Sequence, residues 1–96
     1  MGETRAAIIK AKPRPQYTER ARMNRVEGTV ILNVTLAASG DVKNISVVKG
    51  LPQGLTRAAI EAARRIEFEP AVHREGGLLS QWVELEYVFS LDGADG

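Results

Sequence analysis

The chain of 96 residues has no cysteine, which excludes disulfide bonds, a thiolate nucleophile and thiolate metal ligands. It also has no apolar run near the ~20 residues that a membrane-spanning helix requires. Aromatic residues make up 5% of the sequence, and 13 basic residues stand against 12 acidic ones. Since neither charge sign is in excess, the composition gives no electrostatic argument for binding nucleic acid or an anionic membrane.

The chemical signatures of an enzyme are also missing. His73 is the only histidine, and it lies next to Arg74 and Glu75 without the cluster of ligands that a metal site requires. The serines have no nucleophile-elbow or triad context, and no glycine-rich phosphate loop is present. We therefore expect a protein that is not an enzyme and that uses neither a metal nor a cofactor.

The length and a hydrophobic fraction of 44% are typical of one small globular domain. We assign all of 1–96 to this domain, with a core over about 12–91, an extra strand or linker over 1–11 and a loose tail over 92–96. The first five residues open no signal peptide. We therefore expect either a cytoplasmic chain or a piece of a longer protein.

Two helices are predicted. The first is short and follows Thr18, a good N-cap, and Asn24 is placed to close it in the left-handed conformation. The second is the best helix of the chain, because apolar residues recur at helical spacing, at Leu55, Ala58, Ala59, Ala62, Ala63 and Ile66. Its opposite side is charged, and Glu61 is placed to pair with Arg65 four positions later.

The sequence predicts five extended segments, at residues 6–11, 26–37, 42–49, 68–70 and 79–91. The second of them has apolar residues at every other position, as in a strand with one buried face, namely Val30, Leu32, Val34 and Leu36. In the third segment, Val42 has the opposite parity from Ile45 and Val47, so a bulge is expected to bring all three to one face.

The resulting order is β-α-β-β-α-β, which predicts an α+β fold. We expect a small antiparallel sheet of three to four strands with two helices packed on one face. The ferredoxin-like fold has the same order, but the first helix is short for its crossover. An RNA-binding fold of this order is a distant alternative, because the strands lack the aromatic pattern that stacks on bases.

Five segments resemble, in order, the motifs of the TonB C-terminal family. They are Pro-Gln-Tyr-Thr-Glu-Arg-Ala-Arg at 15–22, Val-Glu-Gly-Thr-Val at 26–30, Ser-Gly-Asp-Val at 39–42, the helix residues Leu55, Ala58, Ala59, Ile60 and Ala63 followed by Phe-Glu-Pro-Ala at 68–71, and the alternating close at 83–89. Together they span about 12–91. One departure is Thr18, where the family usually has proline, although both residues favour the start of a helix.

The resemblance implies a periplasmic, peptide-binding domain of a TonB-type energy transducer, whose parent protein is anchored in the inner membrane and works with ExbB–ExbD. Such a domain captures the TonB box, a short peptide of an outer-membrane receptor, by strand addition. It touches neither nucleic acid nor the membrane itself. In the family the receiving edge is the last strand, which corresponds here to Trp82, Val83, Glu84, Leu85, Glu86, Tyr87, Val88 and Phe89. Contacts to the receptor plug correspond to Arg14, Pro15, Gln16, Tyr17 and Arg20.

Structural interpretations of the same residues stay open. Trp82 either stacks on a bound peptide or covers the sheet, and Glu84 and Glu86 either select basic side chains or deter aggregation. The same edge could serve a structural domain that forms homodimers. Residues 6–11 are a candidate to occupy a sheet edge, and we expect that deleting 1–11 leaves the fold intact and does not weaken peptide binding.

Overall fold

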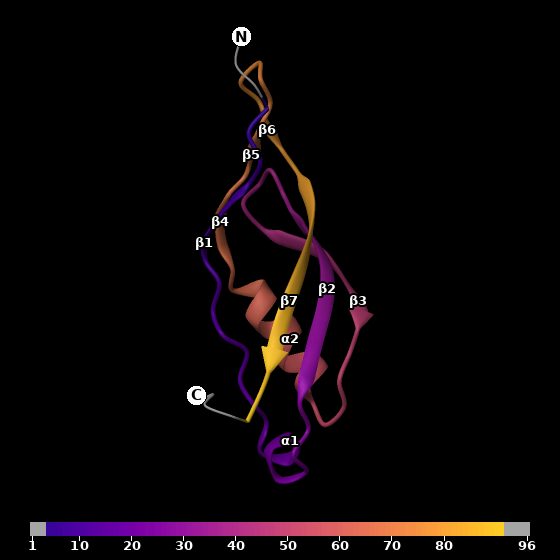
Figure 1. The fold of residues 1–96 in the computed structure, drawn as a ribbon. Coiled ribbons are helices and arrows are strands. Elements are labelled where there is room, and N and C mark those ends of the chain that lie inside the picture. The colour runs from indigo at the N-terminus through magenta and orange to yellow at the C-terminus, as the bar shows by residue number, and fades with distance from the viewer. Residues whose placement is uncertain (1–3, 92–96) are drawn as a thin grey trace.

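The three longest strands form one antiparallel sheet in the order β3-β2-β7 (Figure 1). The computed structural model describes residues 4–91, so the predicted tail at 92–96 lies outside the described residues. The elements are β1 (Ile8–Ala11), α1 (Glu19–Met23), β2 (Gly28–Leu36), β3 (Val42–Lys49), α2 (Leu55–Arg64), β4 (Glu67–Glu69), β5 (Ala71–Val72), β6 (Leu78–Leu79) and β7 (Gln81–Phe89). The α+β class and the main sheet agree with the prediction.

Strand β2 is the centre of the sheet, and its alternating pattern explains why. Its inward residues are fully buried, as predicted, and they are Val30, Leu32, Val34 and Leu36. The predicted bulge in β3 is present, because the register with β2 shifts between Asn33 and Thr35 and Asn44 has a φ of 53°. The bulge turns Val42 and Ile45 toward the core. Val47 pairs with the inward residue Leu32 and therefore lies on the same face, as predicted, although it is 47% exposed.

Helix α2 covers one face of this sheet (Figure 1). Its alanines permit a close approach, and the buried side of the helix consists of Leu55, Ala59, Ala62 and Ala63, followed by Ile66. These residues share one core cluster with the inward side chains of β2 and β7. The charged side differs from the prediction in one contact, because Glu61 pairs with Arg64 at 3.8 Å instead of Arg65.

Helix α1 lies at one end of the sheet (Figure 1). Thr18 caps it as predicted, since the Ala21 N–H donates to Thr18 Oγ1 at 3.0 Å. The left-handed residue after the helix is Arg25, with a φ of 54°, instead of the predicted Asn24. The Val26 N–H reaches back to the Ala21 carbonyl at 2.9 Å, which is the long hydrogen bond of a Schellman motif.

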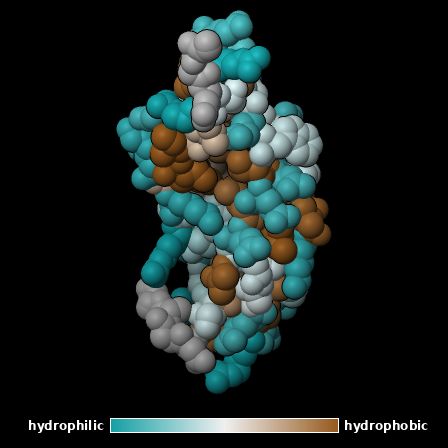
Figure 2. All heavy atoms as spheres, turned by 45° about the horizontal axis from the view of Figure 1, so that its top comes forward, coloured by the Kyte–Doolittle hydropathy of each residue, from teal (hydrophilic) through white to brown (hydrophobic). Residues whose placement is uncertain are grey.

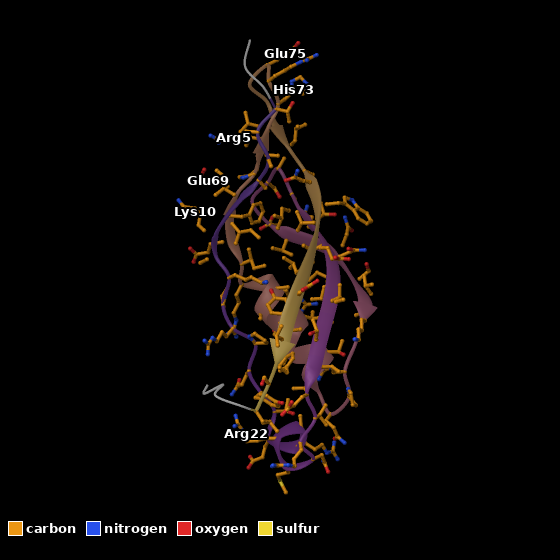
Figure 3. The ribbon with its side chains drawn as sticks, in the orientation of Figure 1. Arg5, Lys10, Arg22, Glu69, His73 and Glu75 are labelled. Carbon is orange, nitrogen blue, oxygen red and sulfur yellow. The ribbon has the colours of Figure 1, made fainter. Side chains whose placement is uncertain are left out.

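The other end of the molecule is a narrow arm. The predicted N-terminal strand forms β1, which pairs with β4 and not with the main sheet. Arg5 and Lys10 both approach Glu69 beside this ribbon, at 3.9 and 3.4 Å (Figure 3). The arm makes the fold long, with extents of 54 × 23 × 16 Å and a radius of gyration of 15.4 Å, against about 12–13 Å for a compact domain of this length.

The predicted last strand is in fact two strands. Residues Leu78–Leu79 fold back onto Ala71–Val72 to form the β5–β6 hairpin, and the strand restarts at Gln81 as β7. Ser80 stands at the break, where its Oγ accepts the Ala38 N–H at 2.9 Å. The break places β6 in the arm and β7 in the main sheet.

Candidate functional site

The main sheet has two outer edges, and they differ in regularity. Strand β7 pairs with β2 over nine consecutive positions, from Gln81 to Phe89, without a register shift. Strand β3 has two register shifts, a left-handed residue at Asn44 and two lysines, Lys43 and Lys49. Bulges and lysines are the usual protection of a sheet edge against further pairing. Strand β7 is therefore the edge with less protection against pairing with a further strand.

The side chains of β7 alternate strictly between core and solvent. The inward residues are Val83, Leu85, Tyr87 and Phe89, which pack in or against the core. The outward residues are Trp82, Glu84, Glu86 and Val88, and Trp82 and Val88 are each 68% exposed. The strand thus packs on the core through one face only, and its other face is exposed to solvent.

The backbone of β7 also alternates between its two sides. Lys12 Nζ donates to the Glu86 carbonyl at 2.9 Å, so this carbonyl points away from β2. In an antiparallel strand the N–H and C=O of one residue point to the same side, and the side alternates along the chain. The backbone polar groups of Glu84, Glu86 and Val88 therefore face the outer edge of β7.

Residues 12–17 run from β1 toward α1 and lie beside the second half of β7. Between the two is a hollow of about 800 Å³, called here the edge groove. Its lining consists of Lys12, Pro13, Arg14, Pro15, Gln16, Tyr17, Arg22 and residues 86–91. The fold thus brings together four of the five predicted receptor-contact residues and the second half of the predicted strand. Arg20 lies exposed on α1, and Trp82 to Leu85 lie outside the groove.

Tyr17 fixes the wall of the edge groove. Its hydroxyl donates to the Val26 carbonyl, and its ring meets the Phe89 ring edge-on with 5.5 Å between centroids. The Arg22 guanidinium lies 5.2 Å from the Tyr17 ring centroid. Loss of hydration, together with nearby Glu27, raises the pKa of Tyr17. Tyr17 therefore joins residues 12–17 both to β7 and to the segment just before β2.

Lys12 is a groove residue that the sequence did not single out. Besides its bond to the Glu86 carbonyl, its ammonium lies 4.7 Å from the centre of the Tyr87 ring. Lys12 stands just before the motif at 15–22, and no pattern in the sequence predicts its reach to a strand 74 positions later. The contact is visible only once β7 and residues 12–17 are adjacent.

Tyr87 carries a polar group that the core leaves without a partner. Its side chain is 3% exposed, and its hydroxyl has no hydrogen-bond partner among residues 4–91. Burial raises the pKa of Tyr87 to about 12. Because an unpaired buried hydroxyl is unfavourable, Tyr87 contributes to the core through its ring and not through its hydroxyl.

The N-terminal strand approaches the outer edge of β7 without pairing with its backbone. The Ala7 N–H donates to Gln81 Oε1 at 2.8 Å, and Lys12 reaches Glu86. These are side-chain bridges, while the backbone of β1 pairs with β4. Strand β1 is therefore not a fourth strand of the main sheet.

Residues 4–91 contain no group of three metal-ligating side chains and no helix long and apolar enough to cross a membrane. His73 lies in the β5–β6 hairpin, at the opposite end of the molecule from Arg22 (Figure 3), and its Nδ1 accepts the Glu75 N–H at 3.0 Å. Apolar side chains form separate patches between polar ones on the face shown in Figure 2.

Comparison with known proteins identifies the family of the chain. The family model of the Gram-negative bacterial TonB protein C-terminal domain covers residues 13–91. The chain belongs to the TonB C-terminal family. Domains of this family are periplasmic, non-enzymatic transducer domains that interact with other proteins.

Individual relatives agree with the family assignment. The chain is 36% identical over 81 residues to Protein tonB2 of Pseudomonas aeruginosa, covering 83% of this chain and 30% of that protein. It is 27% identical over 88 residues to Protein TonB of Vibrio cholerae, covering 91% of this chain and 36% of that protein. The chain thus spans about a third of the length of these relatives.

Solved TonB C-terminal domains share the fold. The solution structure of the Pseudomonas aeruginosa domain matches with a TM-score of 0.72 at 22% identity, over 90% of this chain and 87% of that one. A Helicobacter pylori TonB domain matches with a TM-score of 0.62 at 26% identity, over 82% of this chain and 83% of that one. The α+β fold predicted from the sequence is confirmed by these structures.

Proposed function

We propose that this domain captures the TonB box of an outer-membrane receptor by adding it as a further strand to the outer edge of β7. The observation that carries the proposal is the contrast between the two edges of the sheet. Strand β7 has nine regular positions, while β3 is bulged and carries two lysines. An edge with free N–H and C=O groups accepts an extended peptide through main-chain hydrogen bonds, which tolerate different sequences.

The contacts proposed for the peptide follow from the geometry of the edge. The backbone groups of Glu84, Glu86 and Val88 supply the hydrogen bonds, and the residues from Trp82 to Phe89 form the receiving strand. An incoming N–H takes the Glu86 carbonyl from Lys12, so the Lys12 side chain moves when the strand is added. The predicted receptor-contact residues bind the receptor beside its TonB box, and they are Arg14, Pro15, Gln16, Tyr17 and Arg20.

Force transmission is the second half of the proposal. In the transducer, force derived from ExbB–ExbD reaches the domain through the parent chain and leaves it through the peptide. The load on β7 is then carried by the nine paired positions that join it to β2, and by the core between this sheet and α2. We place the domain in the periplasm, with no direct membrane contact.

Trp82 provides the test, because it is the only tryptophan and lies 68% exposed on β7. Titration with a synthetic TonB-box peptide is expected to change the Trp82 emission and to saturate. The control is the same peptide with alternate backbone nitrogens methylated, which removes the N–H groups that strand addition needs. Equal responses to both peptides, or no response to either, would contradict the proposal.

Self-association through β7 is the alternative use of the same edge. A second copy that pairs there would give a particle of twice 10.5 kDa and would compete with the peptide. Sedimentation of the domain with and without the peptide separates the two functions. A dimer that the peptide does not dissociate would favour the structural domain.

A further inference from the structure

A second groove lies on the other side of residues 14–17. It has a volume of about 630 Å³ and is bounded by residues 14–19 and by the exposed side of α2. Three arginines line it, namely Arg14, Arg57 and Arg65. We call it the helix groove. Since residues 14–17 line both grooves, they form a wall with the β7 edge on one side and α2 on the other.

The charge of the helix groove is unbalanced. Its carboxylates are Glu19 and Glu61, and Glu61 is within 3.8 Å of Arg64, a residue that does not line the groove. Among residues 4–91, no carboxylate lies within 4.0 Å of the guanidinium groups of Arg14, Arg57 or Arg65. Arginine is suited to binding carboxylates because its planar fork donates two parallel hydrogen bonds.

The spacing of the two helix arginines defines the shape of the ligand. Arg57 lies in α2, and Arg65 is the residue that caps the C-terminus of this helix; both are exposed. Their separation of eight positions corresponds to about 12 Å along the helix axis. An extended peptide places residues four positions apart at about 13 Å and on the same side. An extended segment with two acidic residues four positions apart therefore fits the two arginines.

We propose that the helix groove binds an acidic segment of the same polypeptide that adds to β7. The wall formed by residues 14–17 is shared, so a chain paired with the β7 edge can continue across it and reach α2. This inference rests on the proposed function, and it adds a second contact region with a defined charge. The arginines of α2 then determine which flanking sequences bind tightly.

The test uses the TonB-box peptide alone and the same peptide carrying a flexible extension that ends in Glu-Gly-Ser-Gly-Glu. The extension is placed at the amino end in one peptide and at the carboxyl end in another. One of the two is expected to bind about 3- to 30-fold more tightly than the unextended peptide at low ionic strength, with a smaller gain at high salt. Glutamine in place of both glutamates is expected to remove the gain.

Arginine variants locate the effect on the helix. The double variant Arg57→Gln/Arg65→Gln is expected to lose the gain and to bind the unextended peptide normally. Arg74→Gln, which makes the same substitution at an exposed arginine of the distant β5–β6 hairpin, is the matched control and is expected to retain the gain. All three side chains are exposed, so the variants are expected to keep the thermal midpoint of the parent domain.

The possible outcomes separate the inference from the function on which it rests. If the unextended peptide binds normally and neither extension tightens binding, the helix groove does not bind the acidic segment. Strand addition at β7 is unaffected by that result. A gain that persists in the double variant also overturns it. If the unextended peptide does not bind, the proposed function is contradicted. The inference that the same polypeptide also binds the helix groove is then contradicted as well.

Discussion

At the scale of single residues, the two tyrosines of the chain have opposite roles. Tyr17 uses its hydroxyl, which donates to the Val26 carbonyl and holds the groove wall in place. Tyr87 has a buried hydroxyl without a hydrogen-bond partner in the described part of the chain. The sequence pattern placed Tyr87 on the inward face of the last strand, but no local pattern shows whether a buried hydroxyl finds a partner across the core.

Tyr87→Phe is expected to leave the free energy of unfolding unchanged at neutral pH or to raise it by up to about 1 kcal/mol, because it removes an unsatisfied buried group. The alkaline range gives a second readout. Tyr87 has a pKa of about 12 in the folded protein, against 10.0 ordinarily, so the unfolded chain loses this proton first and stability falls as the pH rises from 10 to 12. The variant is expected to lose less stability over that range.

Urea unfolding at pH 7 and at pH 10.5, with the parent protein in parallel, measures both effects. Unfolding at alkaline pH also titrates other groups, and the parent-minus-variant difference removes them. A loss of more than about 1 kcal/mol at pH 7 would show that the hydroxyl is hydrogen-bonded in solution.

Lys12→Met is expected to strengthen TonB-box peptide binding by about two- to tenfold. Methionine retains an apolar stem over the Tyr87 ring, while the ammonium that occupies the Glu86 carbonyl is removed, and a hydrogen bond of this kind contributes about 0.5–1.5 kcal/mol. Fluorescence titration of Trp82 measures the affinity. Weaker binding in Lys12→Met would mean that the ammonium contacts the peptide directly instead of competing with it.

At the scale of elements, local periodicity predicted what depends on neighbours in sequence. The buried side of β2, the buried side of α2 and the Thr18 cap follow from spacing within one segment. The pairing of β1 with β4 joins segments almost 60 positions apart, and no local pattern specifies it. The break at Ser80 was missed because alternation continues across it, and only the partners β5 and β2 distinguish the two halves.

Val88→Pro tests the backbone of β7 at one position in the edge groove. Proline removes an N–H that faces the outer edge and leaves the hydrogen bonds to β2 in place, so peptide affinity is expected to fall about fivefold or more while the domain stays folded. Val88→Ala keeps the N–H and is expected to stay within about threefold of the parent affinity. If both variants weaken binding equally, the side chain and not the backbone makes the contact.

Deletion of residues 1–11 tests the arm. Ile8 and Ile9 are 45% and 38% exposed, so losing β1 is expected to lower the free energy of unfolding by only about 1–3 kcal/mol. The fold is expected to persist and peptide affinity to be undiminished, because β1 pairs with β4 and not with β7. Circular dichroism and Trp82 titration measure the two properties, and weaker binding in the shortened chain would mean that the arm contributes to the peptide site.

At the scale of the whole molecule, the two grooves lie on either side of residues 14–17, and the arm extends one end of a 54 Å body. The sequence predicted both walls of the edge groove, residues 14–17 and the last strand, because each carries a recognisable motif. It did not predict that the first half of that strand, residues 82–85, lies outside the edge groove. It also did not predict that Lys12 and Arg22 line the edge groove, or that Arg57 and Arg65 line the helix groove. Those placements depend on how distant segments pack.

Strand addition at β7 is tested most directly by backbone amide NMR of the isotopically labelled domain during titration with a TonB-box peptide. We predict shifts concentrated along residues 82–90 and 14–20, with protection from hydrogen exchange gained at the amides of Glu84, Glu86 and Val88. The amides of β3 are expected to change little. A well-dispersed spectrum that does not respond to several receptor peptides, or a response centred on β3, would contradict capture at the outer edge of β7.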